Sequence, residues 1–419
     1  MDVNMSQKVK KSILQILLVA AFLTLQGCAD NSQRTKGEEE STIRETETEE
    51  SEVSSGSEIQ TADNDLQNQI LEAMTLEEKV SQMFMPTLEG LTEGGIVTEA
   101  GSAVQTALEQ YPVGGIILFE ENVTAPGQIS ELTANLNHCS MEHVGLPMLI
   151  GTDEEGGRVT RFANNPNFPV EAISDMADIG ATGDGEAAYQ AGTAIGTYLQ
   201  QYGLNLDFAP VADVLTNPDN QVIGARSFGS DPQLVAEMTA EVAGGMQEHG
   251  VYACLKHFPG HGTTSADTHT GAVYTDKSLE ELKALELIPF QRGIEDGISF
   301  IMVSHISAPK VTGKDEPASL SGTMITDVLR QDMGYQGIVI TDAMNMGAIT
   351  GRYSSSEAAV RAIAAGVDII LMPENFREAY QGVLNAVADG TMTEERIDES
   401  VKRILAVKLE IIDNTQNEN

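Results

Sequence analysis

The chain's densest group of potentially reactive side chains is the segment 256–262, Lys-His-Phe-Pro-Gly-His-Gly, followed by Asp267-Thr268-His269. Three of the seven histidines lie in it, and three kinds of chemistry are open to them. His257, His261 and His269 could ligate a metal ion together with Asp267. Alternatively, His269 could transfer protons, because a neighbouring carboxylate such as Asp267 fixes an imidazole tautomer and tunes its pKa. The histidines could also be structural groups of a polar loop.

A second candidate is Asp342, which directly follows the apolar run 337–341. A carboxylate in this position could act as a catalytic nucleophile. The alternative is a helix cap, since aspartate is common before the first helical turn. Together with the histidine-rich segment, Asp342 favours the catalytic interpretation.

These side chains follow short apolar runs that alternate with amphipathic stretches such as 186–201 and 234–249. Near-continuous apolar strands with helical crossovers are typical of a parallel sheet covered on both faces. The eight runs are residues 80–85, 115–119, 148–152, 206–211, 252–256, 300–304, 337–341 and 367–371. Eight strands predict an α/β fold, a (β/α)8 TIM barrel with a single catalytic domain over residues 65–419, closed by a helix at 395–412. The polar residues after the strands would meet at one rim of this barrel.

The first 64 residues differ from the rest of the chain. Residues 1–27 have a basic start and a short apolar core, which is typical of a signal peptide. They end in Leu25-Gln26-Gly27-Cys28, which resembles the lipobox of bacterial lipoproteins, and the resemblance implies lipidation of Cys28. Residues 28–64 are rich in Ser, Thr and Glu, and predict a disordered acidic tether. We therefore expect an extracytoplasmic enzyme that contacts the membrane only through its N-terminal lipid.

The formal net charge is −39, from 63 acidic and 24 basic residues. Such a field repels nucleic acid phosphates and anionic lipid head groups, which argues against both as ligands of the folded body. Three cysteines provide no disulfide framework.

The motifs quoted above resemble the β-N-acetylhexosaminidase branch of glycoside hydrolase family 3. In that branch a flexible loop carries an Asp-His pair, which implies that His269 is the general acid/base, that Asp267 assists it, and that Asp342 is the nucleophile. The resemblance covers about residues 74–412 and implies no metal or other cofactor. Two further stretches also resemble the family, at 153–161 and 223–228. The resemblance implies sugar contacts for Asp153, Arg161, Arg226, Lys256 and His257, whereas we expect Arg158 to form a buried ion pair.

The expected function is retaining, exo-acting hydrolysis of terminal β-linked N-acetylglucosamine from glycans related to peptidoglycan. Three alternatives remain at this point. They are a β-N-acetylglucosaminide phosphorylase, a metal-dependent hydrolase, and a sugar-binding lipoprotein without catalytic activity.

Overall fold

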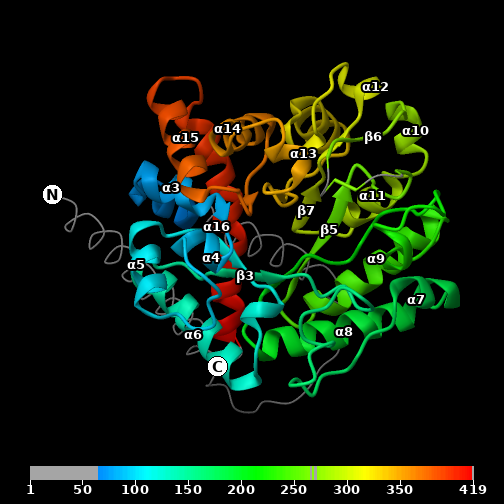
Figure 1. Ribbon diagram of the computed structural model, residues 1–419, viewed down its shortest axis with the longest axis horizontal. Helices are drawn as coiled ribbons and strands as arrows, with labels where there is room; N and C mark the ends of the chain where they lie inside the picture. The colour runs from blue at the N-terminus through cyan, green and yellow to red at the C-terminus, as the bar shows by residue number, and fades with distance from the viewer. Residues whose placement is uncertain (1–64, 265–266, 269–270, 418–419) are drawn as a thin grey trace, which may run out of the picture.

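The protein is described by a computed structural model that covers residues 65–264, 267–268 and 271–417 (Figure 1). Eight parallel strands form a closed ring. They are β1 (Phe84–Met85), β2 (Gly115–Ile117), β3 (Leu149–Thr152), β4 (Leu206–Asp207), β5 (Tyr252–Phe258), β7 (Phe300–Val303), β9 (Ile338–Thr341) and β10 (Ile370–Leu371). Six of them pair in the order β2-β3-β4-β5-β7-β9, and β1 pairs with β10. Single bridges from Thr87 to Ile117 and from Ile340 to Ile369 join the two groups. The predicted (β/α)8 barrel is confirmed.

Helices surround the ring of strands (Figure 1). The longer ones are α5 (Ser102–Gln110), α6 (Pro126–His143), α8 (Gly185–Gln201), α9 (Pro232–Gln247), α11 (Ile288–Glu295), α14 (Ser355–Ala365), α15 (Phe376–Ala388), α16 (Glu394–Asn417) and a π-helix, η4 (Thr323–Asp332). The shorter ones are α3 (Leu76–Gln82), α4 (Leu88–Thr92), α7 (Met176–Thr182), α10 (Leu279–Lys283), α12 (Pro309–Thr312) and α13 (Gly347–Thr350), with 3₁₀ turns η1 (Glu120–Asn122), η2 (Gly224–Arg226) and η3 (Ala318–Leu320). The amphipathic stretches at 186–201 and 234–249 and the closing helix are confirmed as α8, α9 and α16.

The first predicted strand is wrong over its first half. A capping box starts α3, in which the Thr75 side chain accepts the Glu78 N–H and the Glu78 side chain accepts the Thr75 N–H. The helix that this box nucleates continues through Gln82, so β1 contains only Phe84 and Met85. The local capping signal therefore outweighed the apolar pattern of residues 80–85.

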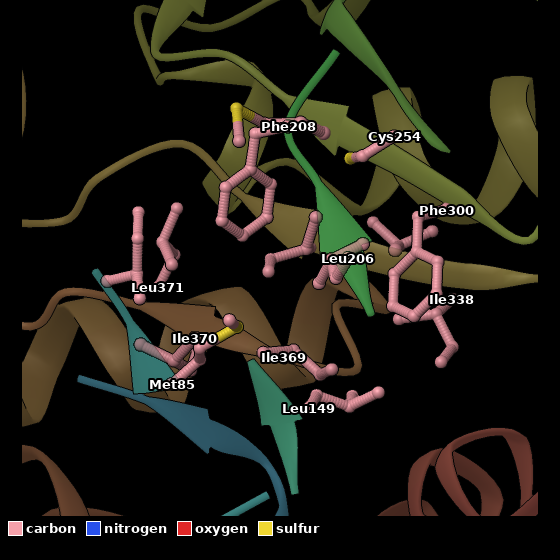
Figure 2. Packing of buried hydrophobic residues seen from close by; sticks show 14 of the residues in the cluster. Met85, Leu149, Leu206, Phe208, Cys254, Phe300, Ile338, Ile369, Ile370 and Leu371 are labelled. Atoms are coloured by element: carbon pink, nitrogen blue, oxygen red, sulfur yellow. The ribbon is translucent and has the colours of Figure 1, made fainter. Parts of the chain in front are cut away.

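The interior of the ring is filled by side chains from strands far apart in the sequence. Figure 2 shows Met85, Phe208 and Ile370 in one cluster with side chains of the neighbouring strands. Gly151 of β3 leaves the room for them, because a Cβ atom there would lie 2.9 Å from the Met85 Cε and 3.1 Å from the Phe208 ring. The barrel is thus a packed core, and a substrate can enter only at its ends.

The first part of α16, the last helix of the barrel, packs beside α3 near the start of the described chain. The buried Lys79 ammonium joins them, 2.9 Å from Glu394 and 2.8 Å from Asp398. A small additional sheet, not predicted, pairs β6 (Val273–Tyr274) in parallel with β8 (Ile306–Ser307), which follows β7 along the chain. Within the described residues no helix is long and apolar enough to cross a membrane.

Candidate active site

The polar residues expected at the rim all lie at the carboxyl ends of the strands. Asp153 follows β3, Lys256 and His257 belong to the last part of β5, His305 follows β7, and Asp342 follows β9. Because the strands are parallel, these ends share one face of the barrel. The structure therefore brings together the residues that the sequence placed far apart.

A buried network of charges forms one side of this site. The Lys256 ammonium lies 2.7 Å from the Asp153 carboxylate and 2.6 Å from that of Glu155. Glu155 also accepts two parallel hydrogen bonds of 2.7 Å from the Arg226 guanidinium, and Arg161 lies 3.4 Å from Asp153. The four predicted sugar contacts in this network are thus joined by a carboxylate that we had not assigned, Glu155.

The charges of this network stabilise one another. Burial alone would raise the pKa of Glu155, but Lys256 and Arg226 outweigh it and hold the pKa far below the ordinary value of 4.5. Burial would likewise lower the pKa of Lys256, but Asp153 and Glu155 raise it above 10.5. Glu155 and Lys256 are therefore ionised at neutral pH, and the cations of the network present oriented N–H donors to a ligand.

The loop that carries Arg161 is held by the buried carboxylate of Glu154. It accepts the backbone N–H groups of Arg161 at 2.5 Å, Phe162 at 3.1 Å and Ala163 at 3.0 Å. The Arg161 guanidinium also lies over the Phe119 ring, 5.2 Å from its centroid. These contacts fix the direction of a predicted sugar-binding side chain before any ligand arrives.

His257 is oriented by Asp213, a fully buried carboxylate shortly after β4. The His257 Nδ1 lies 2.7 Å from the Asp213 Oδ2. Since a carboxylate accepts hydrogen bonds, Nδ1 carries a proton, and Nε2 is the nitrogen left for a ligand. The backbone N–H of His261 donates to the other oxygen of Asp213 at 2.5 Å.

Asp342 is held by its backbone to the neighbouring strand. Its N–H donates to the Val303 carbonyl at 2.9 Å, and its Oδ1 accepts the Ala343 N–H at 2.8 Å. The next helix, α13, begins at Gly347 with Met346 as its N-cap. The helix-cap alternative is therefore wrong, since the Asp342 carboxylate caps no helix.

The surroundings of Asp342 keep its carboxylate ionised. Burial raises its pKa, but electrostatic interactions with His305, His257 and Lys256 and the hydrogen bond from the Ala343 N–H together bring the pKa below the ordinary value of 3.8. The His305 ring lies between the Ala343 carbonyl, 3.0 Å from Nε2, and the Ser319 hydroxyl, 2.7 Å from Nδ1. A half-buried, ionised carboxylate at the barrel rim is suited to nucleophilic attack.

The loop with the Asp-His pair is anchored on both sides of this rim. On one side Asn217 donates to the Thr264 carbonyl at 3.1 Å. On the other side, the Thr268 carbonyl accepts the N–H of Ala348 at 3.1 Å. Ala348 lies six residues after Asp342 in the sequence. Asp267 is half-buried within this loop, and His269 lies outside the described residues.

Two further expectations can be compared with the structure. Among the described residues no group of three or more His, Cys, Asp and Glu side chains could hold a metal ion. The expectation of a buried ion pair for Arg158 is wrong. This residue is exposed, and its guanidinium donates to the carbonyls of Gln221 at 2.9 Å and Val222 at 2.8 Å.

Sequence reasoning missed two functional carboxylates, Glu155 and Asp213. Glu155 stands in the quoted 153–161 stretch, beside Asp153, and could have been singled out there. Asp213 had the same signal as the other rim residues, since it comes shortly after an apolar run. Only the fold, however, shows that His257 is its partner.

Comparison with known proteins agrees with this geometry. Residues 75–407 match the glycosyl hydrolase family 3 N-terminal domain. A β-hexosaminidase of Stenotrophomonas maltophilia is 36% identical over 294 residues, which cover 68% of this chain and 84% of the relative. β-Hexosaminidase A of Pseudoalteromonas piscicida is 34% identical over 328 residues, which cover 73% of this chain but only 54% of the relative.

A solved family 3 β-N-acetylglucosaminidase from Paenibacillus sp. FPU-7 is similar in structure, with a TM-score of 0.76 and 39% sequence identity. The alignment covers 81% of this chain and 63% of the Paenibacillus chain. The chain therefore belongs to glycoside hydrolase family 3. It is an enzyme of that family whose relatives are β-hexosaminidases.

Proposed function

We propose that the enzyme is a retaining, exo-acting β-N-acetylhexosaminidase that releases terminal β-linked N-acetylglucosamine. The observation that carries this proposal is the position of the ionised Asp342 beside an oriented sugar-binding network and the anchored Asp267 loop. The names of the relatives, β-hexosaminidase and β-N-acetylglucosaminidase, support the choice of sugar.

In the proposed mechanism Asp153, Arg161, Arg226, Lys256 and His257 hold the hydroxyls of the terminal sugar. The Asp342 carboxylate attacks the anomeric carbon, and the glycosidic C–O bond breaks as His269, assisted by Asp267, gives its proton to the leaving oxygen. In the second step His269 removes a proton from water, whose oxygen displaces Asp342. Two inversions leave the product with the β configuration of the substrate.

The test is hydrolysis of an aryl β-N-acetylglucosaminide by the wild type and by Asp342→Ala. We expect turnover in the wild type and its abolition in the variant, because no other carboxylate is assigned to the attack. An Asp342→Ala variant with full activity would refute the assignment. Rates with and without inorganic phosphate, and the identity of the sugar product, separate hydrolysis from phosphorolysis. Dialysis against a chelator tests for a metal, and any turnover excludes a protein that only binds sugar.

We also propose that the enzyme is attached to the outer face of the cell membrane by a lipid on Cys28, and that it acts on peptidoglycan-derived glycans. Residues 1–64, with the predicted leader and tether, lie outside the described residues. Support comes from the composition of this segment and from Cys28 at the end of the apolar run. Fractionation of cells that express the wild type or Cys28→Ser tests the anchor, since only the wild type should remain with the membranes.

A further inference from the structure

His261 lies inside the site but has no role in the proposed mechanism. Its side chain is only 2% exposed, and its ring centroid lies 6.0 Å from that of His257. Burial lowers the pKa of the His261 imidazole below its ordinary value of 6.5, although the charges of Asp213 and, more weakly, of Asp342 act in the opposite direction. The His261 imidazole is therefore largely uncharged at neutral pH, and it lies beside the ring of His257, a predicted sugar contact.

The backbone of His261 is fixed at both polar groups. Its N–H donates to the buried Asp213 carboxylate at 2.5 Å. Its carbonyl accepts the Asn220 amide at 2.8 Å, and the Asn220 oxygen in turn accepts the backbone N–H groups of Val222 and Ile223 in the loop that carries Arg226. The imidazole is thus held in place by the same segments that position two sugar contacts.

The two contacts of the Thr264 hydroxyl favour a proton on Nδ1 of His261. The Thr264 Oγ1 lies 2.8 Å from His261 Nδ1 and 2.9 Å from the His261 carbonyl oxygen. A hydroxyl has one proton, and the carbonyl can only accept it. Both contacts are satisfied when the hydroxyl donates to the carbonyl and Nδ1–H donates to the hydroxyl. The Nε2 atom is then an unprotonated acceptor.

This acceptor has no partner among the described residues, although its atom is buried. An unsatisfied buried polar atom destabilises the folded protein, so each one calls for a functional or structural reason. A neutral imidazole with a free lone pair requires a donor, and sugar hydroxyls and the acetamido N–H are donors. The Lys256 and Arg226 side chains of the site can only donate hydrogen bonds to a sugar. An acceptor such as Nε2 of His261 would bind the sugar groups that donate.

We propose that His261 is a further substrate-binding residue, whose Nε2 accepts a hydrogen bond from an O–H or N–H group of the terminal sugar. The proposal builds on the proposed function, because it assumes that the rim binds a pyranose. It assigns to the second histidine of the 256–262 segment a role in sugar recognition in place of metal ligation.

The test uses three variants of the purified protein. His261→Phe keeps an aromatic ring but removes the acceptor, and His261→Gln places an amide oxygen near the position of Nε2. Thr264→Val is the matched control, because it removes the partner of Nδ1 and leaves Nε2 in place. For each we would measure the affinity for N-acetylglucosamine by calorimetry, the thermal midpoint of unfolding, and kcat/KM with the aryl β-N-acetylglucosaminide and the aryl β-glucoside.

We expect His261→Phe to lose about tenfold in affinity and kcat/KM, which corresponds to one hydrogen bond. His261→Gln should recover most of this loss, and Thr264→Val should lose much less. A loss confined to the acetamido sugar identifies the N–H as the donor, and an equal loss with both glycosides identifies a hydroxyl. Both results support the proposal.

Unchanged affinity and kcat/KM in His261→Phe would overturn it. A second pattern would also overturn the proposal. In that pattern His261→Gln does not recover the lost affinity, and Thr264→Val shows the same loss together with a lower thermal midpoint. Such a result describes a histidine that only stabilises the fold. If the wild type hydrolyses no glycoside, the proposed function fails. The calorimetric comparison then still decides whether His261 contacts the sugar.

Discussion

Lys408 allows a quantitative test of the fold that is independent of the chemistry. This lysine of α16 is completely buried, and its ammonium nitrogen lies 2.8 Å from the Gln82 amide oxygen, a neutral partner. Burial lowers the pKa of Lys408 from 10.5 to about 7. A difference of about 3.5 pH units, at about 1.4 kcal/mol for each unit, amounts to about 5 kcal/mol.

The sign of the pH dependence of stability follows from whether the folded or the unfolded state binds the Lys408 proton more tightly. Between pH 7 and 10.5 the unfolded chain holds the proton on Lys408 and the folded protein releases it, so the free energy of unfolding rises with pH. Below about pH 7 both states are protonated, and the folded protein bears the full cost of a buried charge. Lys408→Met should therefore raise the free energy of unfolding at pH 6–7 by a few kcal/mol, after about 1 kcal/mol is subtracted for the hydrogen bond to Gln82.

The assay is urea denaturation at several values between pH 6 and pH 10, for the wild type, Lys408→Met and the control Lys402→Met. Lys402 is exposed on the same helix, so its replacement should leave the pH dependence unchanged. The difference between the wild type and Lys408→Met should shrink as the pH rises, while kcat/KM stays the same. A constant difference across this range, or a less stable Lys408→Met at pH 6, would show that Lys408 is not a destabilising buried charge.

Two further predictions concern buried aspartates. Asp213→Asn can place an amide N–H against the protonated Nδ1 of His257. It should therefore lower kcat/KM by about 10- to 100-fold, with little change in the thermal midpoint of unfolding. Steady-state kinetics that match the wild type would exclude Asp213 as a positioning residue. Asp368 is fully buried and accepts hydrogen bonds from Arg403 at 3.1 Å, from Ser400 at 2.6 Å and from the Val339 N–H at 2.9 Å, besides an ion pair with Arg330. Asp368→Ala should lower the free energy of unfolding by about 3–5 kcal/mol, because it removes the buried carboxylate that several half-buried arginines share. A denaturation midpoint equal to that of the wild type would contradict this.

The architecture was predictable because it depends on short-range patterns. Apolar runs separated by helical stretches define the strands and crossovers, and the right order of parallel strands follows from this alternation. The exception is the first strand, where the Thr75–Glu78 capping box extended a helix through residues that looked strand-like. The β6–β8 pair was missed for a different reason. Two-residue strands carry too few side chains to show a period.

The site was predictable in its residue types but not in its pairings. Asp153, Lys256 and Asp342 could be named because polar groups at strand ends converge in a barrel. The partnership of Asp213 with His257 joins residues 44 positions apart, and that of Glu155 with Arg226 joins residues 71 positions apart. No local pattern specifies such distances, because they depend on the stagger of neighbouring strands.

These pairings separate two electrostatic tasks within one small site. Lys256, Arg226 and Arg161 face the carboxylates of Asp153 and Glu155, so their charges are largely compensated where a sugar would bind. Such cations act mainly as oriented hydrogen-bond donors, which suits a neutral ligand. Within the part of the chain that the structure describes, no salt bridge joins Asp342 to a cation. Its low pKa comes from the combined fields of His305, His257 and Lys256, which outweigh the cost of burial. A nucleophile paired directly with a cation would have to break that contact during attack. When the surrounding fields maintain the ionisation of Asp342, its carboxylate has no cation contact to break during attack.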